Sequence, residues 1–171
     1  MVCYKHMRDI VLIAHNLRSC HNVGSLLRTA EGLGVQRVIL SGYTPHPQHE
    51  NDRRLPHEAQ KISRQIHKTA LGAEDFIPWE YHRDLLPVLA KLQKNGYSVA
   101  AVEQTDDSRS LPNYHPPEKI ALVLGREVEG VEQEILDACD IALEIPMFGK
   151  KESYNVVQAA AMAMYHCRFT V

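Results

Sequence analysis

The chain has 171 residues, the length of one ordinary domain, with 44% hydrophobic and 23% charged residues. This composition excludes disorder, collagen and coiled coils, and no apolar run approaches the roughly 20 residues of a membrane-spanning helix. The net charge of −2 is not typical of nucleic-acid-binding proteins. The first residues lack the apolar segment of a secretory signal, and no paired spacing links Cys3, Cys20, Cys139 and Cys167. We therefore expect free thiols and a cytoplasmic protein.

The charge is unevenly distributed along the chain. Between Glu103 and Glu144 there are eleven acidic and only three basic residues, so the remainder is net positive. The segment from Glu50 to Lys68 contains five basic residues, Arg53, Arg54, Lys61, Arg64 and Lys68, against three acidic ones. Charge alone favours two solvated faces of opposite sign, and a basic surface for phosphate groups is the alternative.

Strand and helix patterns alternate along the whole chain. They predict strands at 9–14, 35–40, 76–81, 97–103, 119–124 and 141–145. They predict helices at 22–34, 58–71, 83–95, 133–139 and 153–165. The uncharged, Ala-rich last helix is expected to be buried nearly all round. Long polar loops are expected at 41–56 and 104–117. The pattern predicts a Rossmann-like α/β domain whose mostly parallel sheet binds ligands at the carboxyl ends of its strands.

The first candidate motif is Asn22-x-Gly24-x-x-x-Arg28, at the start of the first predicted helix. Asn22 suits the N-cap, Gly24 would let a ligand approach closely, and a helix N-terminus attracts anions. Taken alone, the motif is explained more simply by a helix cap and a surface arginine.

Two further motifs follow the later strands. Gly125-Arg-Glu127-x-x-Gly130 begins directly after a strand, where it would form a turn beneath a ligand or a plain strand-to-helix turn. Ile145-Pro-Met147 ends the last strand, and Ser153-Tyr-Asn155 opens the uncharged helix. Ser153 suits the N-cap of that helix, whereas the Asn155 amide needs a hydrogen-bond partner.

In this order and spacing, from residue 9 to 165, the three segments resemble the motifs of the TrmH (SpoU) family of the SPOUT superfamily, which are RNA ribose 2′-O-methyltransferases. The resemblance implies an α/β fold with a deep C-terminal trefoil knot. It implies one methyltransferase domain over 1–171, with no appended RNA-binding domain. It also implies a homodimer that binds S-adenosylmethionine in a bent conformation, releases S-adenosylhomocysteine and needs no metal.

The resemblance assigns roles to particular residues. Its catalytic group is Asn22, Arg28, Glu127, Ser153 and Asn155. Arginine stays protonated, so we expect Arg28 to hold a phosphate and stabilise the alkoxide. Asn22 would orient either Arg28 or the ribose, and Glu127 could pair with Arg28. The cofactor would contact Glu103, Gly125, Ile145, Met147, Ser153, Tyr154 and Val156. Two positions depart from the family pattern, with Arg126 in place of a frequent Asn and Tyr154 in place of a frequent Leu.

The partner implied is RNA, with no membrane. The expected contacts are the basic residues Arg53, Arg54, Lys61, Arg64, Lys68, Lys150 and Lys151. We expect tRNA rather than rRNA, because minimal relatives of this kind act on tRNA. The alternatives are an rRNA methyltransferase and a non-catalytic RNA-binding protein on the same fold. A different nucleotide-binding fold is disfavoured because no G-x-G-x-x-G or P-loop occurs, and the ten histidines show no metal-binding spacing.

Overall fold

The computed structural model describes residues 7–50 and 52–170. Cys3 and most of the N-terminal segment examined for a secretory signal lie outside these residues. Within the described part, Cys20, Cys139 and Cys167 are free thiols. No helix in the described part is both long and apolar enough to cross a membrane.

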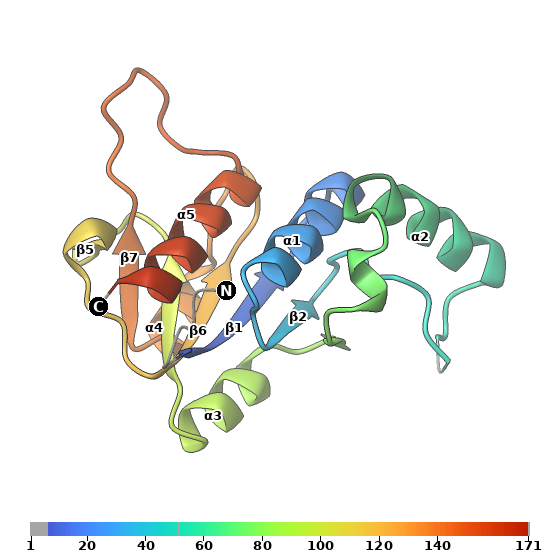
Figure 1. Cartoon of the computed structure of the whole chain (residues 1–171), viewed down its shortest axis with the longest axis horizontal. Helices are drawn as coiled ribbons and strands as arrows, with labels where there is room; N and C mark the ends of the chain where they lie inside the picture. Colours follow the sequence, from blue (N-terminus) through green and yellow to red (C-terminus); the bar gives the residue numbers. More distant parts are fainter. Residues whose placement is uncertain (1–6, 51, 171) are drawn as a thin grey trace, which may run out of the picture.

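One seven-stranded parallel sheet forms the centre of the described chain (Figure 1). Its strands are β1 (Asp9–His15), β2 (Arg37–Ser41), β3 (Trp79–His82), β4 (Ser98–Val102), β5 (Arg109–Ser110), β6 (Lys119–Leu124) and β7 (Ile141–Glu144). They lie in the order β3-β2-β1-β6-β4-β7-β5, and every pair is parallel. The predicted α/β architecture is confirmed, and all carboxyl ends of the strands lie at one edge.

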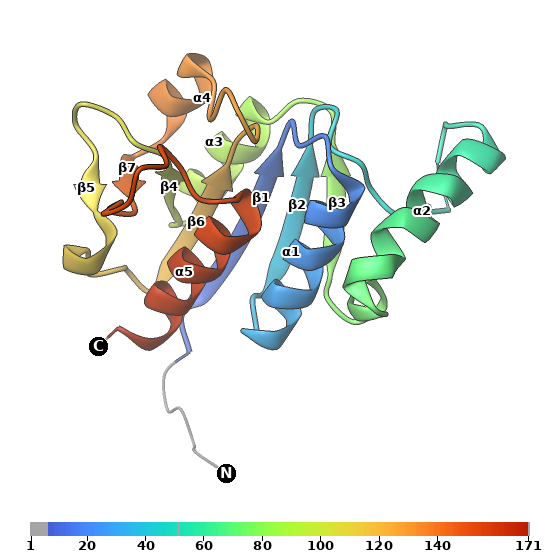
Figure 2. The same ribbon diagram turned by 90° about the horizontal axis from the view of Figure 1, so that it is seen from above.

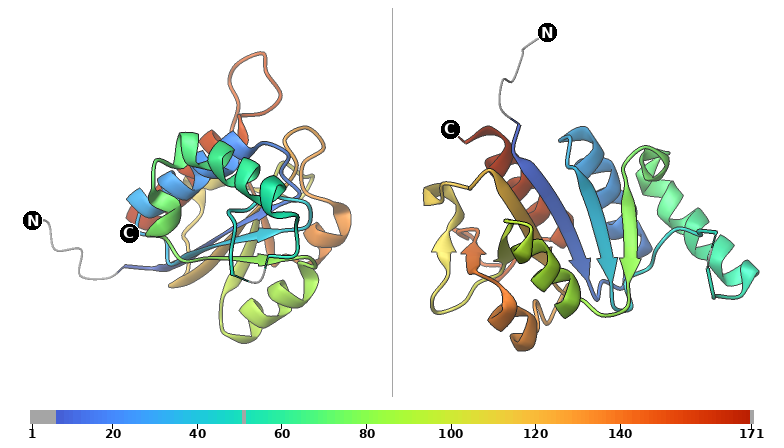
Figure 3. Two further views of the ribbon diagram at one scale, coloured as in Figure 1. Left: turned by 90° about the vertical axis from the view of Figure 1, so that its right-hand side faces the viewer. Right: turned by 90° about the horizontal axis from the view of Figure 1, so that it is seen from below.

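Helices cover both faces of this sheet (Figures 2 and 3). They are α1 (Cys20–Gly32), α2 (Pro56–Ala70), α3 (Leu86–Lys94), α4 (Gln133–Ala138) and α5 (Val156–Phe169). Alternate β1 side chains enter different cores. Ile10 and Leu12 pack with α1, α2 and α5, whereas Val11 and Ile13 pack with α3 and α4. Burial on both faces explains why the strands are continuous apolar runs in the sequence.

The first and last helices begin at residues other than those predicted. Ser19, not Asn22, is the N-cap of α1, and its Oγ accepts a hydrogen bond from the Asn22 backbone N–H at 3.2 Å. Asn155, not Ser153, is the N-cap of α5, and its Oδ1 accepts from the Val157 N–H at 2.9 Å. Ser and Asn are nearly equal as caps, so the sequence alone cannot choose between them. In α5 the choice falls on the residue before Val156, the first buried side chain of the helix.

Two other expectations need correction. The predicted polar loop at 104–117 contains the edge strand β5 and a 3₁₀ turn at Leu111–Asn113, both too short to give a periodic pattern. Helix α5 is not buried all round, because Tyr165 is 60% exposed. The exposed side of α5 is apolar, where it adjoins the 3₁₀ turn.

Gly24 serves helix packing, in place of the expected close approach of a ligand. It lies where α1 crosses α2, and a Cβ atom there would lie 2.2 Å from the Ile66 carbonyl oxygen and 2.9 Å from the Ala70 nitrogen. Both are backbone atoms of α2. The helices can therefore lie this close only if residue 24 has no side chain.

Candidate active site at the carboxyl edge of the sheet

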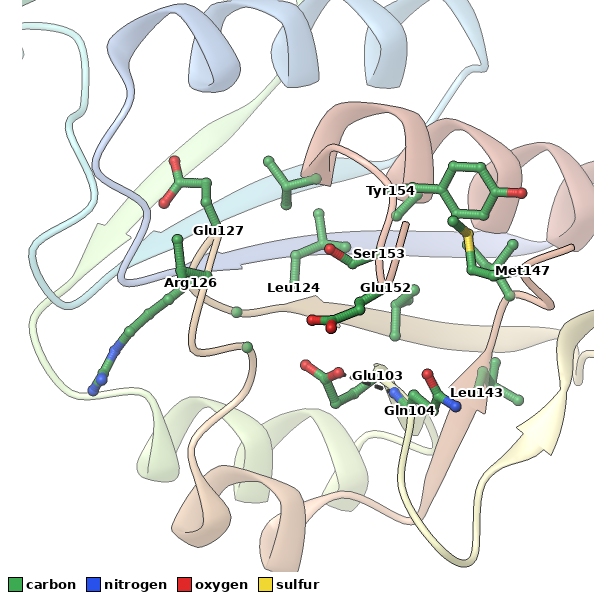
Figure 4. A pocket seen from close by; sticks show the side chains of 17 residues that line it. Glu103, Gln104, Leu124, Arg126, Glu127, Leu143, Met147, Glu152, Ser153 and Tyr154 are labelled. Atoms are coloured by element: carbon green, nitrogen blue, oxygen red, sulfur yellow. Dashed lines mark hydrogen bonds between the residues drawn. The ribbon is translucent and has the colours of Figure 1, made fainter. Parts of the chain in front are cut away.

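A pocket lies at the carboxyl ends of β4, β6 and β7 (Figure 4). Its walls are the loop at 125–130, the loop at 145–155 and the start of α5. Its cavity volume is about 150 Å³, and it opens to solvent. All seven residues expected to contact the cofactor line it: Glu103, Gly125, Ile145, Met147, Ser153, Tyr154 and Val156.

Two glycines shape the loop at 125–130. A Cβ atom at Gly125 would lie 2.4 Å from the carbonyl group of Gly130, and Gly130 has a φ of +74°. Arg126 and Gly130 exchange two backbone hydrogen bonds of 3.0 and 3.2 Å. The glycine spacing in this motif therefore lets the loop fold back on itself at the pocket wall.

Glu103 joins this loop to the end of β4. Its Oε2 accepts a hydrogen bond from the Val131 N–H at 2.9 Å, and its Oε1 accepts from the Gln104 N–H at 3.0 Å. Both carboxylate oxygens are thus engaged with backbone. Glu103 is a structural part of the pocket wall as well as a lining residue.

Glu127 joins the same loop to the start of α1. Its carboxylate accepts hydrogen bonds of 3.2 Å from the backbone N–H groups of Arg18 and Ser19, and another of 3.2 Å from Asn22 Nδ2. Burial opposes the charged form, but the residue's own backbone N–H together with these hydrogen bonds holds the pKa of Glu127 below its ordinary value. Within the described chain Glu127 does not pair with Arg28, because its carboxylate accepts from backbone donors and Asn22 instead.

The five expected catalytic residues do not all meet in one pocket. Asn22 contacts Glu127, and Glu127 and Ser153 line the pocket. Arg28 is exposed on α1, about 9 Å further along the helix axis than Asn22. Asn155 is also exposed, and its Oδ1 is used as the helix cap. In the single described chain, neither Arg28 nor Asn155 lines the pocket.

A buried polar network that the sequence analysis missed supports the loop from behind. The Arg126 side chain points away from the pocket and pairs with Glu132, which accepts a hydrogen bond of 2.8 Å from Asn16 Nδ2 (Figure 4). Asn16 Nδ2 also donates to His15 Nε2 at 3.0 Å, so His15 Nδ1 carries the proton and donates to Ser41 Oγ at 2.8 Å. Burial is the main cause that lowers the pKa of His15. Asn16 has a positive φ of 57°, which asparagine tolerates better than most other non-glycine residues, and this turn is the local pattern behind the arrangement.

The residues expected to bind RNA differ in their surroundings. Lys61, Arg64 and Lys68 are exposed with the i, i+3, i+7 spacing of one face of α2. Arg53 is exposed, and so are Lys150 and Lys151 on the protruding loop before α5 (Figure 1). Arg54 is engaged within its own loop, where its guanidinium pairs with Asp52 and donates to the carbonyl groups of His46 and Pro47.

One group of candidate metal ligands occurs among residues 7–50 and 52–170. His46, His49 and Asp52 have ligand atoms within 4.8 Å of one another. The Arg54 guanidinium, however, contacts both His46 Nδ1 and Asp52, and it holds the pKa of Asp52 well below its ordinary value. A positive charge already occupies this cluster, so the donor set is satisfied by arginine.

The fold and the site together define an α/β domain whose pocket is walled by the second and third motifs and is joined to the first by the Asn22–Glu127 hydrogen bond. The model of the SpoU rRNA Methylase family matches residues 9–165. The chain belongs to this TrmH/SpoU family of the SPOUT superfamily, as its motifs predict.

Individual relatives agree with this assignment. The chain is 30% identical over 155 residues to a Staphylococcus aureus protein described as a TrmH family tRNA/rRNA methyltransferase, covering 91% of this chain and 56% of the relative. It is 28% identical to the 23S rRNA (guanosine-2′-O-)-methyltransferase RlmB of Neisseria meningitidis, covering 93% of this chain and 58% of the relative. The chain thus spans little more than half the length of these relatives.

A solved structure shares the fold. An AdoMet-bound rRNA methyltransferase from Sinorhizobium meliloti superposes with a TM-score of 0.78 at 19% identity, covering 95% of this chain and 56% of that one.

Proposed function

We propose that this protein transfers a methyl group from S-adenosylmethionine to a ribose 2′-hydroxyl of RNA. The observation that carries the proposal is that one pocket gathers segments of the second and third motifs, while Glu127 ties that pocket to the first motif. The 2′-O specificity is supported by the name of the Neisseria meningitidis relative, and the methyl donor by the ligand of the Sinorhizobium meliloti structure.

The pocket residues fit this donor. One part of the lining is apolar and suits a planar adenine: Leu124, Leu143, Ile145, Met147, Val156 and Ala159. Another part carries carboxylates, which suit a cationic ligand. When bound, the donor supplies an electrophilic methyl group on a positively charged sulfur, an activated group that needs no metal.

In this reaction the oxygen–methyl bond forms, the sulfur–methyl bond breaks to release S-adenosylhomocysteine, and the hydroxyl proton passes to water. The chain must align the 2′-oxygen with the methyl group and stabilise the developing alkoxide. We assign the hydrogen-bonded pair Asn22 and Glu127 to positioning the loop at 125–130 against α1, beside the pocket. Ser153 would contribute a polar side chain to the pocket lining. Arg28 remains a proposed clamp for the phosphate next to the reacting ribose.

A homodimer would account for the positions of Arg28 and Asn155 outside the pocket. The apolar outer side of α5, with Ala161, Met162 and Tyr165, continues onto Ile145, which also lines the pocket. A second copy packed on this side would bring its own surface next to the pocket. Sedimentation of the wild type and of Tyr165→Arg tests this, with dimer and monomer the respective expected results.

The remaining finer expectations are kept as proposals. A trefoil knot would thread the segment after β7 so that α5 returns to cover β6, and atomic-resolution tracing of the backbone tests it.

The RNA class stays tRNA as a prediction, with rRNA the alternative, since the Staphylococcus aureus relative is described for both. A cytoplasmic location also stays a prediction.

The test combines transfer and mapping. Purified protein is incubated with methyl-labelled S-adenosylmethionine and unmodified tRNA or rRNA transcripts, and mass spectrometry maps the methylated nucleotides. We expect 2′-O-methyl groups in one class of RNA and a large loss of transfer with Arg28→Ala. If RNA binds but neither transcript is methylated and no S-adenosylhomocysteine binds, the protein is a non-catalytic RNA-binding member of the fold.

A further inference from the structure

Three carboxylates line the pocket, and they differ in how they are engaged. Both oxygens of Glu103 accept backbone N–H groups, and Glu127 accepts two backbone N–H groups and the Asn22 amide. Glu152 makes no hydrogen bond or ion pair within the described part of the chain. Glu152 is therefore the one lining carboxylate whose oxygens are all available to a ligand.

The Glu152 side chain points into the pocket. It extends from the loop at 145–155 into the pocket, and the carboxylate of Glu103 points into the same space from the end of β4 (Figure 4). Two carboxylates that share one pocket repel each other unless a positive charge lies between or beside them. The pocket geometry thus favours a ligand that brings a cationic group to this side.

The chain does not itself supply that positive charge inside the pocket. Arg126 is the only basic residue among the lining residues, and its side chain points away and pairs with Glu132 (Figure 4). Lys150 and Lys151 precede Glu152 on the same loop, but both are exposed and neither lines the pocket. The negative charge of Glu152 is therefore not neutralised by any residue that lines the pocket.

We propose that Glu152 binds the positive charge of the methyl donor and so selects it over adenosine thioethers, whose sulfur carries no charge. This inference rests on the proposed function. S-adenosylmethionine carries a sulfonium and an ammonium group, S-adenosylhomocysteine carries only the ammonium, and 5′-methylthioadenosine carries neither. S-adenosylmethionine and S-adenosylhomocysteine differ by the sulfonium methyl group and its charge, so their comparison isolates that charge. 5′-Methylthioadenosine lacks the whole amino-acid chain and measures the binding of the adenosine part.

The experiment is calorimetric titration of the whole chain with these three ligands. It compares the wild type with Glu152→Gln, which keeps the shape of the side chain and removes its charge. Glu152 is exposed, so we expect the affinity for S-adenosylmethionine to fall about fivefold, the factor that an ion pair of an exposed carboxylate is worth at most. The affinity for 5′-methylthioadenosine is expected to stay within about twofold.

Glu134→Gln is the matched control. Glu134 is an exposed residue of α4 that does not line the pocket, and its substitution changes the net charge by the same amount. It is expected to leave all three affinities unchanged. Thermal unfolding of both variants shows whether either substitution affects folding.

The outcomes separate this proposal from the proposed function. If the wild type binds neither S-adenosylmethionine nor S-adenosylhomocysteine, both fail. If the wild type binds them and Glu152→Gln binds S-adenosylmethionine equally well, only the role of Glu152 is wrong. An equal loss for 5′-methylthioadenosine would also overturn it, because the effect of Glu152 would then not depend on the charge of the ligand. Unchanged donor affinity with lost methyl transfer would place the carboxylate on the acceptor instead.

Discussion

The contact between α1 and α2 at Gly24 gives the sharpest stability prediction. Gly24→Ala adds a Cβ atom at 2.2 Å from the Ile66 carbonyl oxygen and 2.9 Å from the Ala70 nitrogen. Both neighbours belong to the backbone of α2, so the clash cannot be relieved by a side-chain rotation. The two helices must move apart, and the core beneath them loses packing.

The expected magnitude follows from two opposing effects. Overpacking a rigid contact costs about 1–3 kcal/mol, and backbone neighbours place this site at the upper end. Replacing Gly by Ala inside a helix returns about 1 kcal/mol. We expect a net loss of about 2 kcal/mol, which lowers the Tm of a chain this long by about 4–8 °C.

Gly32→Ala is the matched control on the same helix. Apart from its chain neighbours and its own helix, no described residue lies within 4 Å of a Cβ atom at Gly32, so this variant should be as stable as the wild type or gain up to about 1 kcal/mol. Chemical unfolding of the three proteins measures the difference. Equal stability of both variants would refute the packing argument. Loss of S-adenosylhomocysteine binding by a fully stable Gly24→Ala would return Gly24 to the ligand role.

Three further predictions concern charged groups. Arg54→Ala should destabilise the chain by about 1–3 kcal/mol in urea unfolding, because it leaves Asp52 unpaired. Arg53→Ala is its control and should change stability by less than about 0.5 kcal/mol. Arg53→Ala should instead lower the salt dependence of RNA binding, measured by RNA titrations at several salt concentrations. The pKa of His15 is lowered in the folded chain, so below about pH 6.5 the unfolded chain binds more protons and the stability of the fold decreases. His15→Gln should make this decrease smaller when urea unfolding at pH 7.5 is compared with urea unfolding at pH 5.5. An unchanged pH dependence of stability would contradict this prediction. Glu127 also has a lowered pKa, so its charged form stabilises the fold above about pH 4.5 and this contribution is lost in acid. Glu127→Gln should lower the free energy of unfolding at pH 7 by about 1 kcal/mol. Between pH 5 and 3 the stability of this variant should fall less steeply than that of the wild type.

The fold could be predicted from the sequence because each strand is buried on both faces. Continuous apolar runs such as β1 and β6 give a clear pattern, and alternation with helices then requires a parallel sheet. Features set by tertiary contacts gave no such pattern. The N-cap of α1 is Ser19 instead of Asn22, and the amide of Asn22 is held by Glu127, a residue 105 positions away in the sequence.

The candidate site was predictable to a similar extent. The glycines at 125 and 130 and the residues at 145–147 mark pocket walls because their backbone must turn sharply at strand ends. Side-chain direction was not predictable, since it depends on partners far away in the chain. Arg126 is turned outward by Glu132 and Asn16, and Arg54 is turned inward by Asp52. Charge patterns alone therefore could not separate cations that can meet RNA from cations that hold loops together.

The acidic stretch from 103 to 144 acquires a physical explanation from these contacts. Glu103, Glu127 and Glu132 lie at the carboxyl edge of the sheet, where each accepts hydrogen bonds that join one loop to another. Their charge also makes the pocket unfavourable for phosphate groups. Under the proposed function, RNA must then be held by cations outside the pocket, while the pocket itself receives a cationic donor. The same acidic residues that seemed to argue against RNA would thus keep the donor and the RNA backbone in separate places, and only the reacting ribose needs to enter between them.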